Sequence, residues 1–219
     1  MRKIAFVFLV FLCGNGLAQN SFMGWGKVGV KGKIVKRFDW DAELNARVGR
    51  NGLETFFPQV GITYKLQKWV KPSLEYRFII DKNQIGNYKS SHRLNANLNF
   101  EKEWKGVGAE LRVRYQYAFN RVNTLSYDPD FDQAIRLKPA ISYKIPNSIF
   151  TPDVSCEFFY DPLYGPRGQR FTKLRAAIGS KIKLSKQHSL SIKYQIDKRI
   201  RDYGKGIRNV IAVSYSYKL

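Results

Sequence analysis

Apolar and polar residues alternate along almost the whole chain from residue 28 onward. Trp40, Ala42, Leu44, Ala46 and Val48, for example, are separated by polar residues. Successive side chains of a β-strand point to opposite faces, so a period of two predicts strands with one apolar face. The pattern predicts an all-β chain with eleven such segments: Val28–Ile34, Trp40–Val48, Phe56–Leu66, Val70–Ile80, Leu94–Phe100, Val107–Phe119, Ile135–Ile145, Pro152–Tyr160, Leu174–Leu184, Leu190–Ile196 and Ile211–Leu219.

Charge is confined to the other face of these segments. No position on the apolar face is charged, whereas the alternate face carries more Lys and Arg than Asp and Glu. The whole chain has 38 Lys and Arg against 17 Asp and Glu, a net charge of +21. These cations alternate with apolar residues along strands instead of gathering in one stripe, so the pattern does not indicate nucleic-acid binding.

The first residues have the layout of an export signal. Arg2 and Lys3 precede the apolar run Ile4–Cys13, and small and polar residues follow. This order is typical of a secretory signal peptide, with cleavage expected after Ala18 or Gln19. We therefore expect a signal peptide at residues 1–19 and one domain, a β-barrel, at residues 20–219.

The direction of the apolar face separates two architectures. A transmembrane barrel turns this face to lipid, whereas a soluble periplasmic barrel buries it and would bind an anionic or lipidic ligand inside. The segments are long enough to cross a bilayer on a tilt. Aromatic residues gather near their ends, as in interfacial girdles: Trp25, Trp40, Trp69, Trp104, Tyr117, Phe119, Phe158 and Tyr160.

These features favour an antiparallel up-and-down barrel in the bacterial outer membrane. The lipid-facing side is expected to include Val60, Ile62, Leu74, Leu98, Leu111, Val113, Leu137 and Ile141. The last strand, residues 213–219, resembles the C-terminal strand by which barrel-assembly machinery recognises its clients. Expected partners are therefore outer-membrane lipid and this machinery. Single-chain bacterial barrels have an even number of strands, so we expect ten or twelve.

Six short motifs, four of them with arginine, follow one another along the strands. They are Tyr76-Arg77, His92-Arg93, Leu111-Arg112-Val113-Arg114-Tyr115, Ile135-Arg136-Leu137-Lys138, Cys156-Glu157-Phe158 and Ser214-Tyr215-Ser216-Tyr217. This order resembles an uncharacterised outer-membrane barrel family of Bacteroidota, known as domain of unknown function 2490. The resemblance implies a Gram-negative outer-membrane barrel and brings no established activity or catalytic residues.

In such a barrel the charged face lines the lumen. Buried charges need partners, so Glu75, Glu110 and Glu157 are expected to pair with nearby arginines. The excess of cations leaves two interpretations, a salt-bridged structural lumen or a narrow passage that prefers small anions. The predicted lumen network comprises Glu75, Arg77, Arg93, Glu110, Arg112, Arg114, Arg136, Lys138, Asp153, Glu157 and Arg175.

Residues for catalysis or metal binding are sparse. The alternative to a non-enzymatic barrel is an enzyme built on His92 with a serine from another strand and an acidic partner such as Asp130. Asp128, Asp130 and Asp132 alternate in one acidic run but lack the glycine and glutamate of a calcium-binding loop. We expect no catalytic residue, no metal and no cofactor.

Overall fold

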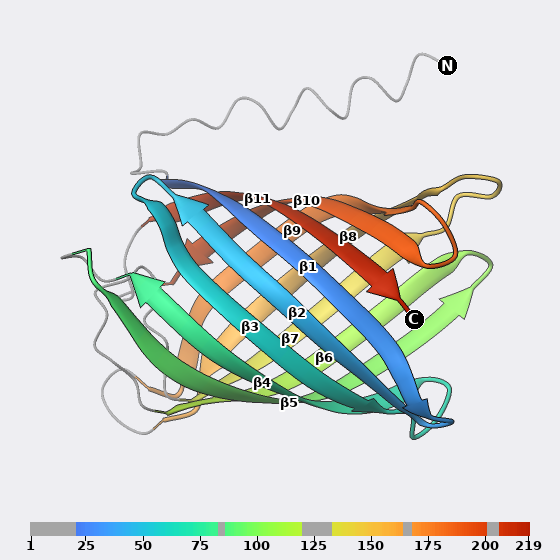
Figure 1. Cartoon of the computed structure of the whole chain (residues 1–219), viewed down its shortest axis with the longest axis horizontal. Helices are drawn as coiled ribbons and strands as arrows, with labels where there is room; N and C mark the ends of the chain where they lie inside the picture. The colour runs from blue at the N-terminus through green and yellow to red at the C-terminus, as the bar shows by residue number, and fades with distance from the viewer. Residues whose placement is uncertain (1–20, 83–85, 120–132, 164–167, 201–205) are drawn as a thin grey trace, which may run out of the picture.

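The computed structural model describes residues 21–82, 86–119, 133–163, 168–200 and 206–219, and these residues form one closed barrel of eleven strands (Figure 1). No helix within these ranges is long and apolar enough to cross a membrane. The strands are β1 (Ser21–Val35), β2 (Phe38–Gly49), β3 (Gly52–Tyr64), β4 (Val70–Lys82), β5 (Tyr88–Trp104), β6 (Val107–Phe119), β7 (Gln133–Tyr143), β8 (Phe150–Asp161), β9 (Arg170–Lys183), β10 (His188–Arg199) and β11 (Ile207–Lys218).

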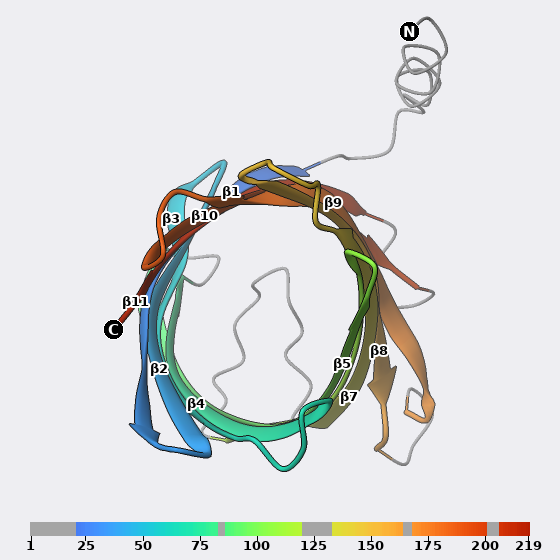
Figure 2. The same ribbon diagram turned by 90° about the vertical axis from the view of Figure 1, so that its right-hand side faces the viewer.

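Each strand pairs antiparallel with the next along the chain. We call the end of the barrel where Ser21 begins β1 the N-terminal rim, and the end that holds Leu219 the C-terminal rim. The C-terminal rim carries the turns β1–β2, β3–β4, β5–β6, β7–β8 and β9–β10, and it faces the viewer in Figure 2. The two-residue turn Lys105-Gly106 joins β5 to β6, with φ of 47° and 82°. Positive φ at both positions is typical of a type I′ turn, which matches the twist of the flanking strands.

The barrel closes through a parallel pair, β1 with β11. The register runs from Ser21 opposite Arg208 to Lys31 opposite Lys218. The two strands lie side by side in Figure 1 with their arrowheads at the same rim. The all-β barrel is confirmed, but the expected count of ten or twelve strands is wrong. An odd number of alternating strands brings the first and last into the same direction, and parallel strands still exchange a full ladder of hydrogen bonds.

The apolar face points out of the barrel. Leu74 is 68% exposed, Ile141 57% and Val60 54%. Of the eight residues predicted to face lipid, seven are exposed, and Val113 on the same side of β6 is half-buried. The interpretation as a soluble barrel with an apolar core is therefore contradicted, because the apolar stripe is the outer surface.

The interior is polar. Asn95 and Asp197 are fully buried, and Glu157 is 2% exposed. Buried Arg114 and Arg136 lie on neighbouring strands at the same level, as register partners. Most of the buried side chains are therefore polar or charged, with a few apolar ones such as Phe57, Phe159 and Val210 among them, and the polar groups have to satisfy one another.

Candidate functional site

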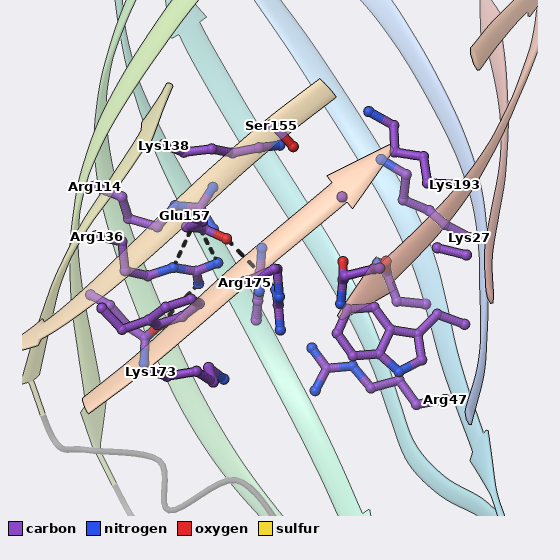
Figure 3. Close-up of a pocket in the computed structure, with 18 of the residues that line it drawn as sticks. Lys27, Arg47, Arg114, Arg136, Lys138, Ser155, Glu157, Lys173, Arg175 and Lys193 are labelled. Carbon is purple, nitrogen blue, oxygen red and sulfur yellow. Dashed lines mark hydrogen bonds and ion pairs between the residues drawn. The ribbon is translucent and has the colours of Figure 1, made fainter. Parts of the chain in front are cut away.

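Three arginines converge on Glu157 in the middle of the lumen. Arg112 Nη2 on β6 and Arg136 Nη2 on β7 lie 2.8 and 2.9 Å from Glu157 Oε1, and Arg175 Nη1 on β9 lies 3.6 Å from Oε2. Arg136 Nε also donates to Oε1 at 3.1 Å. Figure 3 shows Arg136 and Arg175 directed at Glu157. Charge-assisted hydrogen bonds of this kind are about twice as strong as neutral ones.

Arg175 extends this cluster to the next strand. Its Nε and Nη2 atoms each donate to one oxygen of Asp197 on β10 at 2.7 Å. Gln195 Nε2 donates a further hydrogen bond to Asp197 Oδ1 at 3.0 Å. The fork of two parallel hydrogen bonds fixes the plane of the guanidinium group. One ion-pair network therefore joins β6, β7, β8, β9 and β10.

A second cluster surrounds Glu75 on β4. Arg114 Nη2 lies 2.7 and 3.0 Å from the two carboxylate oxygens, and Arg77 Nη2 lies 3.4 Å from Oε2. The side-chain amides of Asn95 and Asn97 donate to the same carboxylate at 3.2 and 3.0 Å. This half-buried acid therefore receives both ionic and neutral donors, as a partly desolvated carboxylate requires.

The remaining predicted lumen residues lie outside these two clusters. Arg93 is buried on β5 opposite Arg77, and Asp153 forms an ion pair with Lys193. Glu110 is exposed and makes no ion pair with another described residue, so the expected pairing of Glu110 with arginine is wrong. Glu110 lies near the C-terminal rim, opposite Glu101, beyond the level of the arginine clusters. Lys138 makes no hydrogen bond or ion pair within the described ranges.

Aromatic rings hold several of these arginines in place. Arg47 and Arg175 lie over the Trp25 ring, 4.3 and 4.8 Å from its centroid. Arg136 lies 4.4 Å from the centroid of Phe159. Trp25 was predicted to belong to an interfacial girdle, and that assignment is wrong because Trp25 is in phase with the lumen-facing lysines of β1. Stacking on a ring keeps a guanidinium group oriented without adding negative charge.

Three cavities lie along the described part of the lumen. The mid-lumen cavity, of about 260 Å³, is lined by eight arginines and four lysines but by only two described acids, Glu43 and Glu157. A connecting cavity of about 440 Å³ shares Lys27, Arg112 and Ser214 with it. A third cavity of about 840 Å³, which we call the vestibule, opens at the C-terminal rim and shares Lys31 and Lys181 with the connecting cavity. The cavities therefore follow one another from the middle of the barrel to this rim.

Small side chains on one side of the lumen make this space. β10 and β11 present Ser189, Ser191, Ser214 and Ser216 to the connecting cavity, and β1 presents Gly29. The arginines that line the same cavity, Arg77, Arg112 and Arg114, stand on β4 and β6. The connecting cavity therefore has long guanidinium side chains on β4 and β6 and short, mostly hydroxyl-bearing side chains on β10 and β11.

Sequence reasoning overlooked several members of this site. Asp197 is in phase with Lys193 on β10, and this period of two would have placed it in the lumen. Gln59, Asn95 and Asn97 carry no charge, and a search for charged residues therefore passes over them. The Nε of Arg77 donates to Gln59 at 2.5 Å, and that of Arg114 to Asn97 at 2.5 Å.

The candidates for catalysis and metal binding lie elsewhere. His92 is on the outer side of β5, stacked on Phe119 with ring centroids 5.3 Å apart and hydrogen-bonded through Nδ1 to the hydroxyl of Tyr76 at 2.6 Å. Asp128, Asp130 and Asp132 lie outside the described residues. No group of three or more potential metal-binding side chains occurs in the part of the chain that the structure describes.

A closed barrel with an apolar outer face and a charged lumen defines the class of outer-membrane β-barrels. Comparison with known proteins agrees. The chain belongs to the family described as protein of unknown function (DUF2490), which it matches over residues 22–203. The family resemblance seen in the sequence is thus confirmed. No curated protein matches the sequence.

Among solved structures the chain is similar to the NanC porin in a rhombohedral crystal form. The two are 15% identical and superpose with a TM-score of 0.57, over 90% of this chain and 98% of the porin chain. At this identity the likeness concerns the fold, a porin-like barrel that points to the outer membrane.

Proposed function

We propose that this protein is an outer-membrane barrel that provides a narrow passage for small anions. The observation that carries the proposal is the mid-lumen cavity, where twelve basic side chains face two described acids. Clefts lined by one sign of charge concentrate the opposite ion. Export through a signal peptide at residues 1–19, and recognition of the last strand by barrel-assembly machinery, belong to the same proposal.

The barrel dimensions support a narrow passage. Eight strands leave an interior that side chains just fill, and wide aqueous channels have sixteen or more. Eleven strands lie near the lower limit, and the arginines of β6, β7 and β9 occupy much of the interior. Short side chains on β10, β11 and β1 keep space beside them. We therefore expect passage of chloride- and phosphate-sized anions and exclusion of larger solutes.

A structural lumen is the second candidate. The observation that favours it is Glu157, whose three arginine partners tie four strands together. In that case the network stabilises the barrel and no current flows. Catalysis is not part of either proposal, since His92 packs among aromatic rings on the outer face.

Ion selectivity in planar bilayers tests the passage. We expect small currents whose reversal potential in a KCl gradient shows anion preference, weakening at high salt as screening shortens the reach of the lumen charge. Lys138→Gln should reduce this preference, because Lys138 lines both the mid-lumen cavity and the vestibule and makes no hydrogen bond or ion pair with a described residue that the substitution would break.

Lys36→Gln is the matched control, because Lys36 lies in the β1–β2 turn and lines none of the three cavities. It should leave the selectivity unchanged. Absence of conductance would refute the passage and leave the structural lumen. Large cation-selective currents would contradict both candidates.

A further inference from the structure

The vestibule at the C-terminal rim has a different chemistry from the mid-lumen cavity. Its described lining contains ten lysines, four acids and no arginine, whereas the mid-lumen cavity contains eight arginines and four lysines. Both are basic. The kind of cation, however, changes from guanidinium in the middle to ammonium at the rim.

Most of these lysines have no partner among the described residues. Lys193 forms an ion pair with Asp153. The other nine make no side-chain hydrogen bond or ion pair with a described residue. The vestibule is therefore a second region of the lumen, besides the mid-lumen cavity, in which basic side chains outnumber acids.

Some of the lysines also repel one another. Lys31 and Lys218 are register partners on β1 and β11, and Lys181 on β9 lies within electrostatic range of Lys31. Like charges on adjacent strands are destabilising. Asp41 on β2, the antiparallel partner of Lys31, offsets only part of this repulsion. An anion bound among these three lysines would remove it.

Ammonium groups suit phosphate. The arginine fork matches a planar carboxylate or a phosphate with two parallel hydrogen bonds, whereas lysine is a compact point charge with rotatable donors, so several lysines can surround an anion of high charge from different sides. Serine and threonine hydroxyls in the same lining, at Ser142, Thr151, Ser189 and Ser191, supply further donors. The volume, about 840 Å³, is within the usual range of small-ligand sites.

We propose that the vestibule binds oligophosphates, compact anions with two or more linked phosphate groups. Linked phosphates engage several lysines at once, whereas a single phosphate reaches few. The proposal goes beyond the passage, because a bound oligophosphate need not cross the arginine-lined middle of the barrel.

Calorimetric titration of the whole folded protein, in a phosphate-free nonionic detergent, tests the site. At constant ionic strength, tripolyphosphate should bind more tightly than pyrophosphate, and pyrophosphate more tightly than orthophosphate. Combining Lys31→Gln, Lys181→Gln and Lys218→Gln should weaken tripolyphosphate binding roughly tenfold or more, because three ion pairs of modest strength are lost.

The control combines Lys36→Gln, Lys89→Gln and Lys105→Gln, which remove the same charge from exposed lysines outside the three cavities. Circular dichroism first establishes that both variants keep the barrel. Equal weakening by both variants, equal affinity for orthophosphate and tripolyphosphate, or no binding of tripolyphosphate would overturn the proposal. Binding of dihexanoyl phosphatidic acid alone would assign the phosphate to a lipid headgroup and would also overturn it.

The calorimetric titration tests the vestibule site and the conductance measurement tests the passage, so one proposal can be refuted without the other. Tripolyphosphate binding without conductance supports this site and refutes the passage. Anion-selective conductance without tripolyphosphate binding refutes this site and leaves the passage intact.

Discussion

Glu157→Gln should destabilise the barrel by about 3–5 kcal/mol, the usual cost of breaking a buried ion pair by removing one partner. The side chain of Glu157 is 3% exposed, and those of Arg136 and Arg175 are 8% and 12% exposed. The substitution keeps the size of the side chain but leaves Arg112 without its carboxylate. Arg175 retains Asp197 and Arg136 retains Gln116, which places the expected cost toward the lower end of that range.

Equilibrium unfolding in urea, with the protein folded into phospholipid vesicles, measures this cost. Glu110→Gln serves as the control, because Glu110 is an exposed acid of the same face that makes no ion pair with a described residue. It should change the free energy of unfolding by no more than about 0.5 kcal/mol. A loss below about 1 kcal/mol for Glu157→Gln, or an equal loss for Glu110→Gln, would refute the argument that the network stabilises the barrel.

Three further predictions concern the wall and the N-terminus. Leu74→Arg places a charge on the lipid side of β4 and should cost about 2–4 kcal/mol in the same unfolding assay; an unchanged free energy would contradict the assignment of that face to lipid. Gly179→Ala should cost about 1–3 kcal/mol, since its Cβ would meet the Ile192 carbonyl and lie 2.8 Å from Lys193 Cα. Gly26→Ala, with nothing within 4 Å of the new Cβ, should cost little. Mass spectrometry of the protein purified from membranes should find a first residue at position 19 or 20, and an intact Met1 would contradict the signal peptide.

The faces of the strands could be predicted because alternation is local. Each residue of a strand points opposite to its neighbour whatever the rest of the chain does, so Leu74 outside and Glu75 inside follow from phase alone. The same rule places Asp197 and Trp25 inside. Asp197 was overlooked and Trp25 was assigned to a girdle because the prediction relied on the number of charges and on the distance from a strand end. The alternation alone would have placed both residues inside the barrel.

The partners within the lumen could not be predicted in the same way. Arg112 on β6 reaches Glu157 on β8 across the intervening strand, a separation of 45 residues. That contact depends on the registers of two successive pairs and on the curvature of the wall. Whether the number of strands is odd or even is also a long-range property, because nothing within β1 or β11 determines that the two strands meet in parallel. The three cavities depend in turn on which short side chains the closure brings opposite the arginines.

Parallel closure also has a topological consequence for any experiment that locates the ends of the barrel. In a barrel with an even number of strands, the first strand begins at the rim where the last one ends. Here β1 begins at one rim and β11 ends at the other. An epitope inserted just before Ser21 and one fused after Leu219 would therefore be displayed on opposite sides of the bilayer, and antibodies applied to intact cells would reach only one of the two.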